Sequence, residues 1–189
     1  PYSRDGAGRD TGQAGESVNE FRKRMEGDIS NLLNGEGKVA VALSGGIDST
    51  CCLLACLDLK LDVTAYTFYL DGHESQDLHA ARQITRTLGV NLREVTVPYT
   101  LDSLQTDVAK IIREYRTARK TAVQCIHPFM YLIPLISEQT IISGLYADDL
   151  YGTSKNGTII GNRNKEEYHD LLIDSPLNKN KRASVNGIY

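Results

Sequence analysis

In Val39-Ala40-Val41-Ala42-Leu43-Ser44-Gly45-Gly46-Ile47-Asp48-Ser49-Thr50, an apolar run is followed by a glycine turn and a helix start, and the rest of the chain is organised around it. Residues 39–43 form a continuous apolar run, which is typical of a parallel strand buried on both faces. Residues 50–59 are apolar almost all round, which predicts a buried helix. The loop between them therefore lies at the amino end of a helix, where unpaired N–H groups and the helix dipole favour an anion.

The residue types of this loop fit a phosphate group. Gly45 and Gly46 leave backbone N–H groups accessible and tolerate positive φ angles, while Ser44 and Ser49 supply hydroxyl donors. A carboxylate such as Asp48 would repel a phosphate unless a cation lay between them, so its presence predicts Mg²⁺. The loop is not a Walker loop, because the Gly-Lys-Ser/Thr ending is missing. A purely structural glycine turn is the alternative.

The composition predicts an ordinary globular domain. The chain has 189 residues, which suits one domain with a core that needs no disulfides. Its net charge of −3 gives no general attraction to nucleic acid or to anionic membranes. Neither an apolar run of membrane-spanning length nor a signal peptide is present, so we expect a cytoplasmic protein without membrane contacts.

The cysteines and histidines give weaker signals. Three of the four cysteines lie on the apolar helix and suggest small core side chains in a reducing compartment, while a sulfur-carrying role for Cys125 is the sharper alternative. The four histidines lack metal-ligand spacing and are interpreted as incidental.

Beyond the central loop, strands and helices alternate along the sequence. Residues 1–16 are Gly-rich and predict a flexible segment, so that the folded domain spans 17–189 and opens with a capping box at Ser17–Glu20. Periodicity and turn residues predict strands at 39–43, 63–70, 92–97 and 140–143, and helices at 17–33, 50–59, 75–88, 101–112 and 122–136. Pro128 and Pro134 are expected to bend or interrupt the last of these helices. A basic stretch after residue 112 fits a solvated helix end or a rim that attracts an anionic substrate.

This alternation predicts an α/β fold with a parallel sheet and right-handed crossovers. Ligands of such sheets bind at the carboxyl ends of the strands, near the point where the strand order reverses. The loop Ser44–Ser49, the strand end at Leu70 and the segment after Ser143 should therefore meet. That last segment contains Asp148 and Asp149, and Asp148 would share Mg²⁺ with Asp48. The alternative is an acidic pair at a helix N-terminus.

The motif Ser-Gly-Gly-Ile-Asp-Ser resembles the PP-loop of the N-type ATP pyrophosphatases, and the chain from Val39 onward resembles the synthetase domain of asparagine synthetases. The stretches that carry the second resemblance are 67–72, 75–81, Met130-Tyr131-Leu132, 143–152 and Asn180-Lys181-Arg182-Ala183-Ser184. The resemblance implies a three-layer fold of the adenine nucleotide alpha hydrolase type. It also implies a hydrophobic contact between Leu70 and adenine and a catalytic lysine at Lys181, with Lys179 as the fallback.

The residues expected at the site follow from the motif and the resemblance together. Asp48 and Lys181 are the expected catalytic residues, and Asp48 and Asp148 the expected metal ligands. ATP is expected to contact ten residues: Leu43, Ser44, Gly45, Gly46, Ile47, Asp48, Ser49, Leu70, Ser143 and Gly144.

Two departures from the asparagine synthetase pattern bear on the substrate. The family glutamate that helps to position substrate and nitrogen is Leu145 here, which can do neither. The sequence also contains no glutaminase domain, and it begins with Pro1 instead of a nucleophilic cysteine. We therefore expect ammonia to come from outside this chain, and aspartate is in doubt as the substrate.

The resemblance implies an amide-forming ligase that uses ATP and Mg²⁺ to adenylate a small-molecule or peptide carboxylate for an amine or ammonia acceptor. A separate amidotransferase or partner subunit is compatible with this, as is a homo-oligomer. One alternative is a nucleotide-binding pseudoenzyme or a subunit of a larger assembly. Another is a PP-loop enzyme acting on a nucleotide or tRNA, although no basic RNA-binding tail supports nucleic-acid binding.

Overall fold

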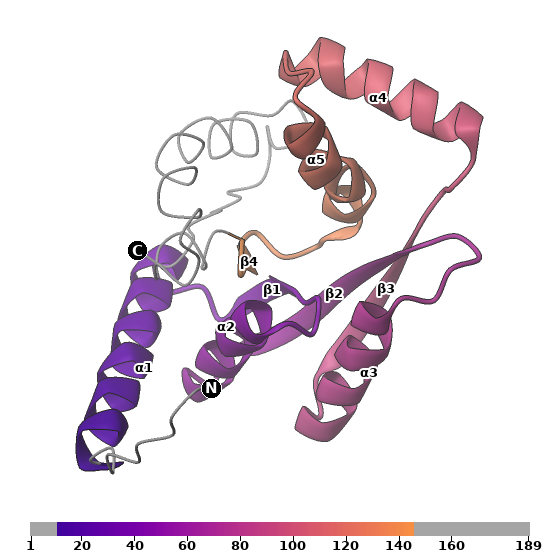
Figure 1. The fold of residues 1–189 in the computed structure, drawn as a ribbon. Coiled ribbons are helices and arrows are strands. Elements are labelled where there is room, and N and C mark those ends of the chain that lie inside the picture. Colours follow the sequence, from indigo (N-terminus) through magenta and orange to yellow (C-terminus); the bar gives the residue numbers. More distant parts are fainter. Residues whose placement is uncertain (1–10, 146–189) are drawn as a thin grey trace, which may run out of the picture.

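A four-stranded parallel sheet forms the centre of the molecule (Figure 1). The computed structural model describes residues 11–145. The strands are β1 (Lys38–Ala42), β2 (Asp62–Leu70), β3 (Asn91–Val97) and β4 (Ile141–Ser143), in the spatial order β3-β2-β1-β4. In the register of the sheet, Val41 lies opposite Ala65 on one side and Ile142 on the other. The predicted parallel α/β class is therefore confirmed.

The two faces of β1 carry different side chains and bury different helices. Val39, Val41 and Leu43 share one hydrophobic cluster with residues of α1 (Thr11–Leu33), α2 (Ile47–Asp58) and α3 (Gln76–Leu88). Ala40 faces the opposite side, in a cluster with Leu132 at the end of α5 (Lys120–Leu132) and with residues around η1 (Ile133–Leu135). Both faces of the strand are thus covered by helices, which gives the three layers expected of this class.

The helix α4 (Leu101–Tyr115) packs on α5 and lies farther from the sheet than α5 does (Figure 1). A buried carboxylate joins the two helices, because Asp107 accepts a hydrogen bond of 2.6 Å from the Tyr131 hydroxyl and lies 3.0 Å from Nε2 of His127. His127 is therefore a structural partner of Asp107, although the sequence suggested an incidental histidine.

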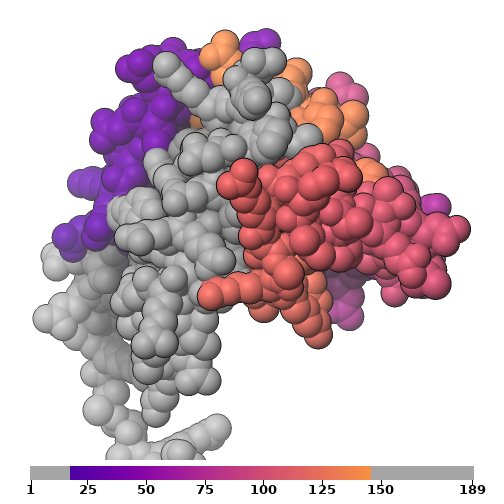
Figure 2. Space-filling model, turned by 90° about the horizontal axis from the view of Figure 1, so that it is seen from above, coloured from indigo at the N-terminus to yellow at the C-terminus, as the bar shows by residue number. Residues whose placement is uncertain are grey.

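Viewed from above, α4 and α1 lie at opposite sides of the molecule (Figure 2).

Local signals in the sequence set several helix ends correctly. The Ser75 side chain caps α3 by accepting a hydrogen bond from the Leu78 N–H, and Gly89 ends that helix in the left-handed conformation with φ +69°. Helix α5 contains Pro128 and ends at Leu132, before the 3₁₀ turn that contains Pro134. The predicted interruption at the second proline is confirmed, since proline cannot supply the N–H that would continue the helix.

Two expectations about helices are wrong. The first helix begins at Thr11, so the expected capping box at Ser17 lies inside a helix that starts six residues earlier. Helix α2 is not buried all round, because Leu54 is 42% exposed even though Cys52, Leu53 and Cys56 have no exposed surface. The outer face of α2 is apolar and exposed, and single apolar residues at the surface are common in folded proteins.

Candidate functional site

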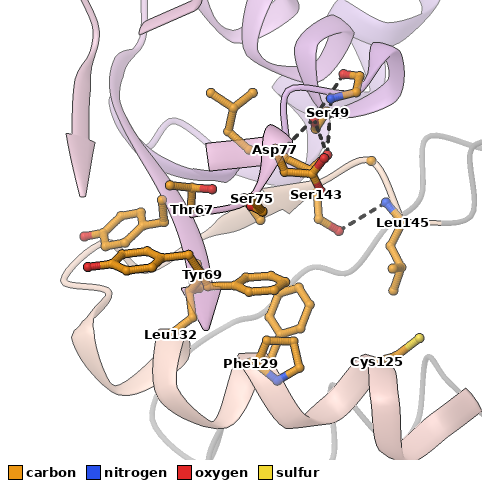
Figure 3. A pocket seen from close by; sticks show the side chains of 18 of the residues that line it. Ser49, Thr67, Tyr69, Ser75, Asp77, Cys125, Phe129, Leu132, Ser143 and Leu145 are labelled. Carbon is orange, nitrogen blue, oxygen red and sulfur yellow. Dashed lines mark hydrogen bonds between the residues drawn. The ribbon is translucent and has the colours of Figure 1, made fainter. Parts of the chain in front are cut away.

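A cavity of about 550 Å³ lies at the carboxyl ends of β1, β2 and β4 (Figure 3). Its lining includes Ser44 and Ser49 of the central loop, Leu70 at the end of β2, and Ser143 and Gly144 after β4. The three segments that the sequence predicted to meet are therefore brought together. The volume falls within the range of about 300–1,000 Å³ that is typical of small-molecule sites.

Hydrogen bonds within the loop hold its serines close together. The Ser49 hydroxyl accepts from the Ser44 N–H at 3.2 Å, lies 3.1 Å from the Ser44 hydroxyl, and donates to the Gly46 carbonyl at 3.2 Å. The Thr50 hydroxyl donates to the same carbonyl at 2.8 Å. The loop is thus closed on the first turn of α2 by its own side chains.

Gly45 is required by both its conformation and its surroundings. Its φ of +82° lies in the left-handed region that side chains disfavour. A Cβ atom there would lie 2.5 Å from the Cβ atom of Ala80 on α3. The loop therefore rests directly on α3, which the sequence did not indicate.

Gly144 makes a second close approach, from β4 to the start of α2. A Cβ atom at this position would lie 2.6 Å from the Ser49 nitrogen and 2.7 Å from the Asp48 Cβ atom. Any side chain would crowd the backbone of the first helical turn. Glycine here lets the β4 end pass beside the amides of α2.

The N-terminus of α2 differs from those of α3 and α4. Ser75 and Thr100 cap the latter two through their side chains, whereas the N-cap residue of α2 is Gly46, which forms no side-chain cap hydrogen bond. The positive end of the α2 dipole therefore faces the cavity without a side-chain cap. This arrangement favours an anion such as a phosphate.

The expected site residues lie in three groups. Eight of the ten expected ATP contacts line the cavity: Leu43, Ser44, Gly46, Asp48, Ser49, Leu70, Ser143 and Gly144. Gly45 and Ile47 are not part of the lining. Gly45 lies on the side of the loop that packs against α3, and Ile47 is 78% exposed. Asp148, Lys179 and Lys181 lie outside the described residues.

Sequence reasoning missed the wall that α5 contributes. This wall consists of Gln124, Cys125, Pro128, Phe129 and Leu132. Periodicity could not find it, since α5 is in contact with both the sheet and α4, and apolar residues occur on several of its sides. Most of the other lining residues come from β2, the turn after it and the start of α3: Tyr66, Thr67, Phe68, Tyr69, His73, Glu74, Ser75 and Asp77. Ala42 of β1 and Leu145 after β4 complete the lining.

The charged groups of the described lining are mainly acidic. They are the carboxylates of Asp48, Glu74 and Asp77, and the described lining contains no lysine or arginine. Within residues 18–145, no three His, Cys, Asp or Glu side chains cluster as a metal site. A divalent cation bound here would therefore take its remaining ligands from phosphate oxygens, water or other parts of the chain.

Cys125 lies half-buried in the cavity wall. Burial raises the pKa of its thiol above the ordinary value, which keeps the sulfur protonated near neutral pH. Desolvation also raises the pKa of both Cys52 and Cys56 to about 12. The structure therefore favours apolar packing for Cys125 over a reactive thiolate.

Fold and site together define the class of this protein as an open parallel α/β protein with a glycine loop and a ligand-sized cavity at the point where the strand order reverses. The chain belongs to the asparagine synthase family, whose model matches residues 20–179. This finding confirms the resemblance to the synthetase domain of the PP-loop superfamily.

A curated relative is similar over most of the chain. It is a probable glutamine-hydrolyzing asparagine synthetase from Acanthamoeba polyphaga mimivirus, 25% identical over 163 residues, which are 82% of this chain. The matched region spans 29% of the length of that relative.

Two solved structures are also similar. The NMN synthetase of Francisella tularensis aligns over 90% of this chain and 76% of its own, with 17% identity and a TM-score of 0.47. The NH3-dependent NAD synthetase of Campylobacter jejuni aligns over 70% of this chain and 58% of its own, again with 17% identity and a TM-score of 0.47.

Among the described helices, none has the length and apolar character needed to cross a membrane.

Proposed function

We propose that this protein is an ATP-dependent adenylating enzyme that activates a carboxylate for amide formation. The observation that carries the proposal is the convergence of the Ser44–Ser49 loop, the β2 end and Ser143–Gly144 around one cavity. Membership of the asparagine synthase family supports the same chemistry.

The phosphates of ATP fit the loop and the first turn of α2. Gly46 leaves that helix end without a side-chain cap, and the Ser44 and Ser49 hydroxyls line the adjoining cavity. Leu70 lies at the strand end and would contact the adenine ring, as the family resemblance implies.

The carboxylate of Asp48 fits a role as a Mg²⁺ ligand. It lies in the cavity lining within the first turn of α2, and a carboxylate beside bound phosphates is tolerated when a cation separates the charges. Asp148 remains the proposed second ligand. Bound Mg²⁺ would neutralise the negative charge of the phosphates.

The proposed reaction has two steps. A carboxylate oxygen of the substrate attacks the α-phosphorus, and the bond from that phosphorus to the bridging oxygen breaks, so that pyrophosphate leaves. An amine or ammonia nitrogen then attacks the acyl carbon, loses a proton and releases AMP. Amides of the loop would stabilise the leaving pyrophosphate, and Lys181 is proposed to stabilise the charge of the transition state.

The nitrogen donor is proposed to be ammonia or an amine, delivered freely or by a separate amidotransferase or partner subunit.

A second candidate function is a nucleotide-binding pseudoenzyme or subunit. The presence of Leu145 in the cavity lining favours this second function, since leucine can neither position a polar substrate nor hold an incoming nitrogen.

Product analysis of Mg-ATP incubated with pooled carboxylic acids and ammonium tests the proposal. AMP and pyrophosphate that depend on one pool are expected, whereas ADP and phosphate would refute it. ATP binding without turnover under all conditions would favour the pseudoenzyme.

Asp48→Asn should reduce AMP formation by at least a hundredfold while leaving the fold intact, because it removes one charge and keeps the side-chain volume. Asp71→Asn is the matched control, since Asp71 is exposed and does not line the cavity. Turnover of Asp48→Asn at the wild-type rate would contradict the assignment of Asp48.

A further inference from the structure

The cavity has two sides, because β1 lies between β2 and β4 in the sheet. Leu70 follows from β2 on one side of the Ser44–Ser49 loop, and Leu145 follows from β4 on the other. If adenine occupies the Leu70 side, as proposed above, the Leu145 side is left for the carboxylate that attacks the α-phosphorus. This assignment of adenine and carboxylate to the two sides rests on the proposed function.

The wall that Leu145 shares with α5 is largely apolar in the described residues, with Gln124 as a polar exception. The Leu145 side chain points toward α5, from which Cys125 and Phe129 contribute to the same cavity (Figure 3). All three residues are partly buried. The raised pKa of the Cys125 thiol has burial as its cause, which agrees with a dry surface at this end.

Polar groups near Leu145 are engaged with one another. The Leu145 N–H donates to the Ser143 hydroxyl at 3.4 Å, so the backbone of this segment turns back on itself (Figure 3). The lining carboxylates belong to Asp48 in the first turn of α2, Glu74 in the β2–α3 turn and Asp77 in α3, so none comes from β4 or α5. No described lysine or arginine in the lining would pair with a second negative charge on the substrate.

We propose that the acyl substrate carries an apolar group, aromatic or branched aliphatic, which packs between Leu145 and the α5 residues Cys125 and Phe129. An acidic side chain, such as that of aspartate, would be desolvated against this wall without a cationic partner among the described lining residues. Apolar area, in contrast, gains free energy on burial there.

An exchange experiment tests substrate choice on the unmodified protein. Carboxylate-dependent exchange of labelled pyrophosphate into ATP is measured with phenylalanine, leucine, phenylacetate, aspartate and glutamate, each with Mg-ATP. At least one apolar carboxylate should show a kcat/KM at least tenfold above that of aspartate. A preference for aspartate or glutamate would overturn the proposal.

A second readout does not depend on turnover. The same carboxylates are tested for protection of Cys125 against alkylation by iodoacetamide, with the modified peptide quantified by mass spectrometry. Apolar carboxylates should slow the alkylation of Cys125 at least threefold, and aspartate should leave it unchanged. Protection by aspartate alone, or by none of the carboxylates, would overturn the proposal even if ATP is bound.

The variant Leu145→Glu should lower the kcat/KM for the preferred apolar carboxylate by about tenfold to a hundredfold, since it places a charge where the apolar group packs. Leu101→Glu is the matched control, because Leu101 is 71% exposed and outside the cavity lining. Equal activity of the two variants would contradict the role of Leu145.

Failure of the proposed function has a different signature. In that case ATP gives ADP or no exchange with any carboxylate, while the alkylation experiment still reports whether apolar acids occupy the Leu145 side.

Discussion

Substitution of Gly45 by alanine should destabilise this protein more than the same substitution at any open glycine with positive φ. The new Cβ atom would lie 2.5 Å from the Ala80 Cβ atom, 3.1 Å from the Ala81 nitrogen and 3.2 Å from the Ala80 carbonyl carbon. Ala80 has no flexible side chain that could move aside. Either the loop or α3 must shift.

Two costs add at this position. Holding alanine in the left-handed conformation costs about 1–2 kcal/mol. The collision with α3 resembles overpacking of a core and adds about 1–3 kcal/mol. The expected loss is therefore about 2–5 kcal/mol, which for a chain of this length lowers Tm by roughly 4–20 °C.

Gly72→Ala separates the two costs, because Gly72 has φ +75° and no atom within 4 Å of the position of an added Cβ. This control should lose only the conformational part, about 1–2 kcal/mol. Urea denaturation of both variants gives the difference directly. Equal losses in the two variants would refute the claim that α3 limits the position of the loop.

A double substitution tests the same contact from the other side. Ala80→Gly removes the Cβ atom that collides with residue 45, although glycine within α3 itself costs about 0.5–1 kcal/mol. Combined with Gly45→Ala, it should show a favourable coupling of at least about 0.5 kcal/mol. Strict additivity of the two substitutions would argue that the strain lies elsewhere.

Two further predictions concern Gly144 and Tyr131. Gly144→Ala should weaken ATP binding in calorimetry by at least about tenfold, because its Cβ atom would lie 2.6 Å from the Ser49 nitrogen, and unchanged affinity would contradict the proposed phosphate position. Burial, assisted by the Asp107 carboxylate, raises the pKa of Tyr131 from 10.0 to about 12. The folded state therefore keeps this proton between pH 10 and 12 while the unfolded chain loses it, so stability falls as the pH rises across this interval. Tyr131→Phe should flatten that fall in urea titrations, and an unchanged slope would contradict the shift.

The sequence predicted those features that depend on neighbouring residues. The strand before the loop, the glycines in the loop, the Ser75 cap and the end of α3 at Gly89 all follow from local chemistry, and all are present. The meeting of the loop with Leu70 and Ser143 was also predictable, because parallel strands bring their carboxyl ends to one edge of the sheet.

Features that depend on distant residues were not predictable in this way. The contact of Gly45 with Ala80 joins positions 35 residues apart, and no pattern in the sequence marks it. The α5 wall was missed because an apolar helix in contact with both the sheet and α4 does not show which residues face a cavity. The buried Asp107 was missed because a charged residue on a helix is normally solvated, and only its two partners on α5 explain its position.

The pairing of β1 with β4 has a consequence for biosynthesis. Ala40 pairs with Ile141, Val41 with Ile142 and Ala42 with Ser143, so about 100 residues of chain separate the two halves of this ladder. At a translation rate of about 5–20 residues per second, the glycine loop emerges from the ribosome roughly 5–20 s before Ser143–Leu145. For most of that interval, once β2 (Asp62–Leu70) has been synthesised, a nascent chain can pair β1 with β2 but lacks one side of the cavity. Nucleotide captured cotranslationally would therefore be held only weakly, and full affinity would appear only after the last described strand has been synthesised.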